Sequence, residues 1–116
     1  MSTRLPGAKY SRIFDRGRSF KGRLLVAWRL SSPDADRQAG VVVSRKSFHD
    51  AVDRNRAKRL MREAFRLLVK AGRMPANTEW VFVGRAALGG KKVQDVVEDI
   101  AALCARLSGD AKPHVR

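Results

Sequence analysis

The sequence has a single cysteine, Cys104, and no long apolar run. One cysteine cannot form an internal disulfide, which suits a reducing compartment. Residues 1–20 contain no apolar run of signal-peptide length, and no other stretch approaches the length of a membrane span. We therefore expect a soluble, cytoplasmic protein of one domain over residues 1–116, with residues 1–7 as a loose basic arm and residues 108–116 as a tail.

The residues on which protein nucleases rely are also scarce. The two histidines, His49 and His114, lie far apart in the sequence, and neither a CxxC nor an HExxH spacing occurs. No GxxxxGK[ST] loop is present to hold a nucleotide. Nuclease chemistry by a protein needs a general base, an activated nucleophile or a positioned metal ion. The sequence therefore predicts neither a catalytic residue nor a metal or cofactor site in the chain itself.

Acidic residues are too few to balance the basic ones. The chain carries 25 lysines and arginines against 11 aspartates and glutamates, which gives a formal net charge of +14. Self-repulsion on this scale destabilises a compact state, so the excess points to an anionic partner. Nucleic-acid phosphates supply that counter-charge. An anionic membrane surface is the competing partner, but the basic segment lacks the exposed Trp/Phe-rich face of interfacial helices.

The positive charge is concentrated in residues 54–66, where six of thirteen residues are basic. On a helix with about 100° per residue, the apolar side chains gather on one side: Ala57, Leu60, Met61, Ala64, Leu67 and Leu68. The polar side chains gather on the opposite side: Asn55, Lys58, Arg59, Arg62, Arg66 and Lys70. Glu63 can pair with Arg59, but such an exposed pair contributes only about a few tenths of a kcal/mol. Solvated helix faces usually mix both signs, so this face predicts contact with a nucleic acid.

Hydrophobic periodicity predicts an α/β fold with a small sheet. Helices are expected over residues 8–16, 51–71 and 91–107, and strands over residues 19–30, with an interruption near Gly22, 39–44 and 80–83. In the first strand region one face is expected to carry Leu24, Val26, Trp28 and Leu30. Asp50 or Asp53 is expected to cap the long helix, and Gly72 to end it.

The final helix is expected to separate apolar from acidic residues. Cys104 falls on its apolar side and is interpreted as a core residue. Asp95, Glu98 and Asp99 fall early on its outer side, where the helix dipole favours them. These carboxylates are interpreted as dipole partners rather than metal ligands, and their patch is expected to face away from RNA.

Residues 54–63, Arg-Asn-Arg-Ala-Lys-Arg-Leu-Met-Arg-Glu, resemble the signature of the bacterial ribonuclease P protein component. Residues 40–46, Gly-Val-Val-Val-Ser-Arg-Lys, resemble the strand of that family that ends in Ser-Lys/Arg-Lys, and the similarity covers about residues 4–107. The resemblance implies an α+β two-layer sandwich with a central sheet of about four strands and three helices, in the order αβββαβα. It also implies a left-handed βαβ crossover, against the usual rule.

The resemblance further implies an RNA-binding subunit of an endoribonuclease that removes the 5′ leader from precursor tRNA. In that family the RNA subunit is the catalyst and uses bound Mg²⁺, while the protein binds the catalytic RNA and the leader. The partners implied are therefore the catalytic RNA and precursor tRNA, without DNA or membrane.

The family motifs also assign site residues by position. Contact with the catalytic RNA is implied for Arg54, Asn55, Arg56, Lys58, Arg59, Arg62 and Arg66. A leader-binding cleft is implied for Tyr10, Phe14, Trp28, Arg45 and Lys46. Aromatic side chains beside basic ones hold unpaired nucleotides by stacking, without strict sequence readout.

Three other functions are compatible with the composition. A generic RNA-binding structural protein of the ribosomal type is opposed only by the Arg-Asn-Arg block and the aromatic residues. A DNA-binding module would need a short partner helix and turn, which the pattern around the basic helix does not indicate. A stand-alone ribonuclease is disfavoured by the missing catalytic residues.

Overall fold

The computed structural model describes residues 5–31, 33 and 37–111, with side chains as far as residue 106. A short 3₁₀ turn, η1 (Gly7–Lys9), leads into α1 (Tyr10–Arg16), and the other elements follow in order: β1 (Arg18–Lys21), β2 (Leu25–Ser31), β3 (Gln38–Val42), α2 (Ala51–Lys70), β4 (Thr78–Gly84), η2 (Ala86–Leu88) and α3 (Val93–Ala111). This confirms the predicted order αβββαβα with three helices and four strands.

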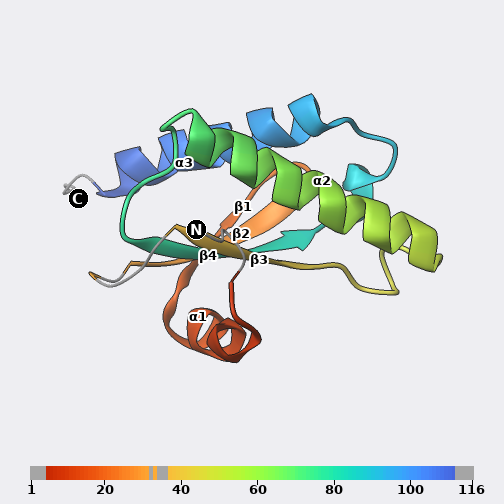
Figure 1. Ribbon diagram of the computed structural model, residues 1–116, viewed down its shortest axis with the longest axis horizontal. Helices are drawn as coiled ribbons and strands as arrows, with labels where there is room; N and C mark the ends of the chain where they lie inside the picture. Colours follow the sequence, from red (N-terminus) through yellow and green to blue (C-terminus); the bar gives the residue numbers. More distant parts are fainter. Residues whose placement is uncertain (1–4, 32, 34–36, 112–116) are drawn as a thin grey trace.

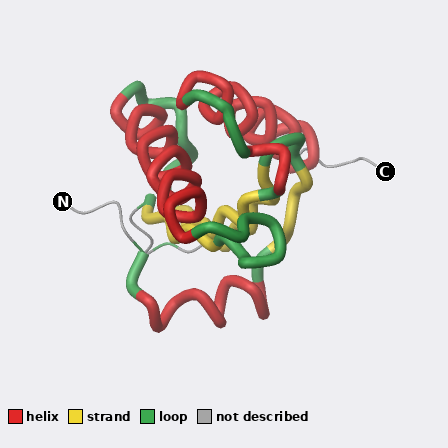
Figure 2. The backbone as a smooth tube through the Cα atoms, turned by 90° about the vertical axis from the view of Figure 1, so that its right-hand side faces the viewer, coloured by secondary structure: helices red, strands yellow, loops and turns green. Residues whose placement is uncertain are grey.

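The four strands form one sheet in the order β1-β2-β4-β3. β2 is antiparallel to β1 and to β4, whereas β3 runs parallel to β4, so that α2 connects two parallel strands. The hand of this crossover stays a prediction from the resemblance. α2 and α3 lie side by side over one face of the sheet, as the expected sandwich requires, and α1 lies across the other face (Figures 1 and 2).

The central strand β4 explains why two cores form. Trp80 and Phe82 point to the side of α2 and α3, where they stack with ring centroids 5.8 Å apart. Val81 points to the side of α1 and is packed with Ile13 in a smaller core. Successive side chains of a strand alternate between the faces, so a strand covered on both faces is buried along nearly its whole length, as β4 is, including its polar residues Thr78 and Glu79.

Four boundary predictions need correction. Leu24 precedes β2 and is buried in the main core beside Leu25, so the expected alternation begins only at Val26. Leu5, in the expected loose arm, is 6% exposed, and its N–H donates to the Ala39 carbonyl at 3.0 Å. α3 continues to Ala111, so residues 108–111 are helical rather than part of a tail. α1 begins at Tyr10 rather than residue 8, after the 3₁₀ turn. Residues 1–4 and 112–116, with His114, lie outside the described residues.

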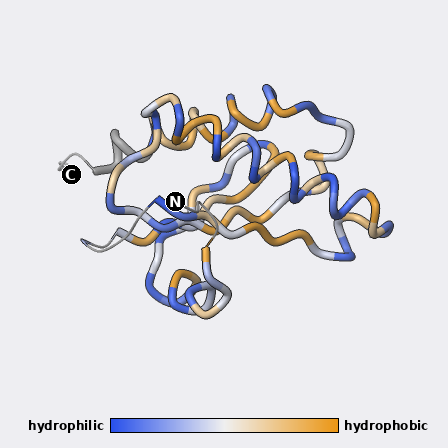
Figure 3. Tube along the Cα trace, viewed as in Figure 1, coloured by the Kyte–Doolittle hydropathy of each residue, from blue (hydrophilic) through white to orange (hydrophobic). Residues whose placement is uncertain are grey.

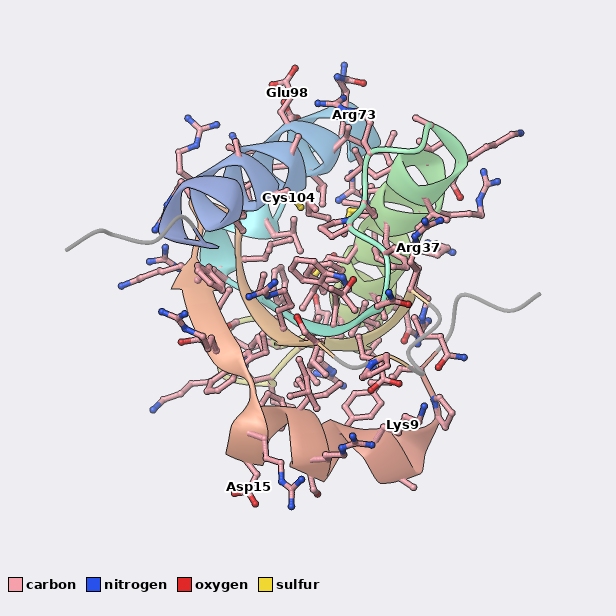
Figure 4. The ribbon with its side chains drawn as sticks, turned by 90° about the vertical axis from the view of Figure 1, so that its left-hand side faces the viewer. Lys9, Asp15, Arg37, Arg73, Glu98 and Cys104 are labelled. Carbon is pink, nitrogen blue, oxygen red and sulfur yellow. The ribbon has the colours of Figure 1, made fainter. Side chains whose placement is uncertain are left out.

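The acidic patch of α3 is also not as expected. Glu98 is exposed and points away from the protein (Figure 4), and Asp95 accepts a hydrogen bond from the Lys92 N–H at 2.9 Å, at the start of the helix. Asp99, however, is only 6% exposed. It faces the sheet, where its two carboxylate oxygens accept backbone N–H groups of the β1–β2 turn.

Among the described residues no helix combines the length and apolar character needed to cross a bilayer.

Candidate nucleic-acid interface

α2 buries one side of the basic sequence of residues 54–66. The buried side chains of the helix are Ala57, Met61, Ala64, Phe65 and Leu68. Figure 3 shows hydrophilic and hydrophobic residues alternating along the helix. Two positions differ from the helical wheel: Phe65 is 1% exposed and lies against Phe82, whereas Leu67 is 36% exposed. The buried side of α2 is therefore rotated toward Phe65 and away from Leu67, compared with the side that the helical wheel predicts.

The helix begins and ends where the sequence predicts. Asp50 occupies the N-cap position, although its side chain makes no capping hydrogen bond. Gly72 follows the last turn with φ +71, a left-handed conformation that glycine adopts without strain. A helix of 20 residues results, long enough to carry the whole basic segment on one rigid element.

The opposite side of α2 is cationic and open to solvent. Asn55, Arg59 and Arg66 are exposed, and Lys58 and Arg62 are half-buried. With the described residues, the side chains of Asn55, Lys58 and Arg59 form neither a hydrogen bond nor an ion pair. A hollow of about 530 Å³ is lined by, among others, Arg56, Arg59, Arg62 and Arg66. Asn55, Lys58 and Arg59 therefore offer uncompensated donors to an anion, whereas Glu63, which lines the same hollow, is paired with Arg66.

Two arginines of the signature have structural contacts that the sequence did not predict. Arg54 Nη1 donates to the carbonyl oxygens of Phe48 at 3.0 Å and of His49 at 2.8 Å, which ties the bend before α2 to the helix. Arg56 Nη2 donates to the Lys91 carbonyl at 2.7 Å, close to the start of α3. Since a guanidinium has five N–H donors, both residues keep further N–H donors beyond these contacts with the protein backbone.

The predicted pairing of Glu63 is wrong. Its carboxylate contacts Arg66, not Arg59, with Arg66 Nη2 to Glu63 Oε2 at 2.6 Å. The hydrogen bond from Arg66 lowers the pKa of Glu63. Arg59 consequently keeps its full charge, and Arg66 is the one arginine of the two that a neighbouring carboxylate partly neutralises.

On the other face of the sheet, α1 and β2 bring together two of the aromatic residues that were predicted to line the leader-binding cleft. Phe14 and Trp28 pack edge to face, with ring centroids 5.2 Å apart and planes at 84°. Phe14 is 39% exposed, and Trp28 is half-buried. Their exposed ring surface is available for stacking.

Tyr10 belongs to the same face but lies over a different strand. Trp28 of β2, Val81 of β4 and Gly40 of β3 are paired in one row across the sheet. A side chain at position 40 would collide with the Tyr10 ring, so Tyr10 lies directly on β3 while Phe14 lies beside β2. Ile13, between them on α1, is fully buried in the smaller core with Val81.

The next row of this face is apolar and half-exposed. Val26 of β2 pairs with Val83 of β4, which pairs with Val42 of β3, and all three side chains are half-buried. We call these valines together with Tyr10, Phe14 and Trp28 the aromatic surface. Arg45 and Lys46 follow β3 in an exposed turn, where Ser44 Oγ accepts the Ser47 N–H at 3.1 Å. This turn leads from the aromatic surface to the N-terminus of α2.

An ion pair holds α1 at its start. Lys9 Nζ lies 2.6 Å from Glu79 Oε2, and Glu79 is 2% exposed. Figure 4 shows Lys9 at the start of α1, between that helix and the sheet. The sequence did not predict this pair. The sequence signal is a glutamate directly before the apolar residues 80–83, on the face to which Val81 and Val83 also point.

Among the described residues, no group of three or more His, Cys, Asp or Glu side chains could hold a metal ion. Burial raises the pKa of Cys104 to about 11, and its Sγ lies 3.9 Å from Met74 Sδ. The thiol therefore stays protonated at neutral pH and packs as a core side chain.

Comparison with known proteins gives a consistent result. The model of the family described as Ribonuclease P matches residues 5–108. The ribonuclease P protein component of Pelotomaculum thermopropionicum is 38% identical over 97 residues, which cover 84% of each chain. The corresponding protein of Exiguobacterium sp. is 42% identical over 92 residues, covering 79% of this chain and 77% of that one.

Solved structures agree on the fold. The ribonuclease P protein from Thermotoga maritima superposes with a TM-score of 0.75 at 27% identity, covering 90% of this chain and 97% of that one. The protein from Staphylococcus aureus gives a TM-score of 0.74 at 22% identity, covering 92% and 96%. Since the family model matches nearly the whole described chain and the relatives are up to 42% identical over most of its length, this chain belongs to the ribonuclease P protein family.

Proposed function

We propose that this chain acts as the RNA-binding subunit of ribonuclease P and contacts two RNAs with two faces. The cationic side of α2 binds the catalytic RNA, and the aromatic surface binds the 5′ leader of precursor tRNA. The observation that carries the proposal is the partly exposed Phe14–Trp28 pair on the face of the sheet opposite to α2. We propose the cytoplasm as the compartment of this activity.

The aromatic surface suits a single strand. Every base has a π-face, so stacking on Phe14 or Trp28 does not depend strongly on sequence. The half-buried valines beside them offer an apolar floor to bases rather than to phosphates, whereas Arg45 and Lys46 are exposed at the end of β3. This combination supports the binding of leaders of different sequence.

The cationic side of α2 suits a folded RNA. Arg59 and Lys58 have no partner among the described residues, so their charges are available to phosphates, and counterions released from the RNA favour the complex. Asn55 adds an amide that can both donate and accept, which fixes orientation where charge alone does not. Arg54 and Arg56 keep the helix correctly placed on the bend and on α3.

The chain supplies position and charge rather than the chemical step. Ribonuclease P is an endoribonuclease, and this protein is its subunit; we assign the catalytic centre to the RNA. Magnesium ions held by the RNA would activate the attacking water and stabilise the leaving oxygen. Two observations on the described residues support this assignment: both oxygens of Asp99 accept backbone N–H groups, and no group of three or more His, Cys, Asp or Glu side chains could hold a metal ion.

Reconstitution tests this function. The full chain is mixed with bacterial ribonuclease P RNA and a precursor tRNA at low magnesium, and cleavage at the mature 5′ end is followed over time. We expect faster cleavage than with the RNA alone, because the protein reduces the repulsion between two polyanions. Binding of both RNAs without any acceleration would indicate instead a generic RNA-binding structural protein.

A further inference from the structure

The turn between β1 and β2 is fixed by a buried carboxylate. Asp99 Oδ1 accepts the Arg23 N–H at 3.1 Å, and Oδ2 accepts the Leu24 N–H at 2.9 Å. A Cβ at Gly22 would lie 2.6 Å from Asp99 Oδ2, so only glycine lets the turn approach this closely. Both oxygens of Asp99 therefore accept hydrogen bonds from the backbone, and Asp99 forms no ion pair with the described residues.

Four basic side chains surround this turn. A hollow of about 350 Å³ is lined by Lys21, Arg23, Arg85 and Arg106, together with Gly22, Asp99, Ala102 and Leu103. The four cations come from β1, the turn, the segment after β4 and α3. Asp99 is the single carboxylate among these lining residues, so their formal charge sums to +3.

Two of the cations are held in place without being neutralised. Arg85 Nη1 donates to the Gly22 carbonyl at 2.7 Å, and Arg106 Nη1 donates to the Lys21 carbonyl at 2.8 Å. Carbonyl oxygens orient a guanidinium but carry no full charge. Each arginine therefore keeps further N–H donors in a fixed direction, which is the arrangement that binds a phosphate group with two parallel hydrogen bonds.

The hollow lies at the same end of the sheet as the basic turn after β3. Strand pairing brings together the ends of β1 and β4 and the start of β2, since Lys21 pairs with Val26 and Leu25 pairs with Gly84. Val42, at the end of β3, is in the same row beside Val83. Four strands at about 4.8 Å spacing separate the outer two by about 14 Å, so a few nucleotides can bridge the end of the sheet.

We propose that this hollow is a second phosphate site, in which Lys21, Arg23, Arg85 and Arg106 bind a phosphodiester of single-stranded RNA. The site rests on the proposed function, because the strand we expect there is the leader after it leaves the aromatic surface. The same phosphodiester chemistry could come from the catalytic RNA, and the experiment separates these two sources.

The variants are Lys21→Gln and Arg106→Gln, each compared with Arg73→Gln. Arg73 is exposed and precedes β4, at the opposite end of that strand from Arg85, so its substitution removes the same charge away from the hollow. Arg106→Lys retains the charge and serves as a rescue. Thermal unfolding of each variant establishes that the fold is retained.

Two affinities are measured for each variant over a range of salt concentrations. The first is that of the reconstituted holoenzyme for precursor tRNA with a long or a one-nucleotide leader, and the second is that of the protein for the catalytic RNA. For a leader phosphate, we expect each Gln variant to weaken long-leader binding about fivefold at about 0.1 M salt and to reduce the salt slope by about 0.7. The affinity of Lys21→Gln and Arg106→Gln for the precursor with a one-nucleotide leader should then equal that of Arg73→Gln.

Weaker binding of the Gln variants to the catalytic RNA, with equal effects on long-leader and short-leader precursors, would support the site with the catalytic RNA as the source of the phosphate. Affinities and salt slopes equal to those of Arg73→Gln in both measurements would overturn the proposal. If the unsubstituted chain fails to accelerate cleavage, the proposed function is lost. Binding of the free chain to a single-stranded oligonucleotide then tests the hollow separately, with the same variants and the same expected loss.

Discussion

The ring of Tyr10 lies on the backbone of Gly40, in the space that a Cβ at position 40 would occupy. This contact places α1 over β3, while Phe14 of the same helix meets Trp28 of β2. The spacing of the aromatic surface therefore depends on a residue that has no side chain.

Gly40→Ala should consequently displace α1. The added methyl group collides with the Tyr10 ring, and overpacking of this kind typically costs about 1–3 kcal/mol of unfolding free energy. We expect lower stability in urea and weaker binding of long-leader precursor tRNA. Gly7→Ala is the matched control, because a Cβ there meets nothing within 4 Å. An unfolding free energy of Gly40→Ala equal to that of the unsubstituted chain would show that α1 can shift without loss of stability.

Trp28→Ala should weaken the binding of long-leader precursors more than that of leaderless tRNA. Stacking on an aromatic side chain contributes about 1–3 kcal/mol per base, and Phe14→Ala should act in the same direction. The difference between the two substrates is measured by equilibrium binding to the holoenzyme. Val52→Ala removes an apolar side chain that is 75% exposed on α2 and should not distinguish them. Equal losses for both substrates would remove the leader assignment.

Arg59→Ala should weaken assembly with the catalytic RNA and reduce the salt slope of that binding by about 0.9 for a duplex contact. Glu63→Gln should act in the opposite direction, because it releases Arg66 from its carboxylate partner and removes a negative charge beside the phosphates. Filter binding across salt concentrations measures both effects. An Arg59 variant with the original slope would place this side chain outside the interface.

Arg54→Ala should reduce stability as well as RNA binding, since the guanidinium holds two carbonyl oxygens of the bend before α2. Hydrogen bonds of this kind contribute about 1 kcal/mol each. Arg54→Lys keeps the charge but cannot span both carbonyls in the same planar geometry, so stability should stay low. Arg59→Lys, by contrast, should retain stability and most of the RNA affinity. Chemical denaturation of these three variants distinguishes a structural role from a role in RNA binding alone.

Because of Cys104, the free energy of unfolding should decrease with rising pH in the alkaline range. Burial raises the pKa of its thiol to about 11, from an ordinary value of 9.0, so the folded state favours the protonated form. This contribution is complete below about pH 9 and is lost as the pH rises toward 11, because the unfolded chain releases the proton first. Cys104→Ala should flatten the unfolding free energy in this interval. Alkylation by iodoacetamide at pH 8 should also be slow until the chain unfolds.

The sequence predicted those elements whose signals are local. The basic helix has a 3.6-residue period, a capping position at Asp50 and a terminating glycine within one continuous stretch, and its bounds agree with the structure to about one residue. The family resemblance implied that Phe14 and Trp28 line one cleft. The structure brings their rings into contact, and their role in binding stays a prediction.

The contacts that the sequence did not reveal join distant residues. Asp99 accepts hydrogen bonds from residues 75 and 76 positions away, and Lys9 is paired with a glutamate 70 positions later. Helical periodicity alone places Asp99 on the outer side of α3. It takes no account of the distant β1–β2 turn, whose backbone N–H groups donate to Asp99. The basic hollow was missed for the same reason, since its four cations come from separate segments.

The location of α1 and α2 on the two faces of the sheet has a geometric consequence. A β-sheet and its packed helices are close-packed and resist compression, so the protein acts as a rigid spacer between whatever binds on either side. Two RNAs held in this way would keep a constant separation, independent of their own flexibility. The thickness of the protein, as much as its charge, would then determine which bond of the substrate comes within reach of the ribozyme.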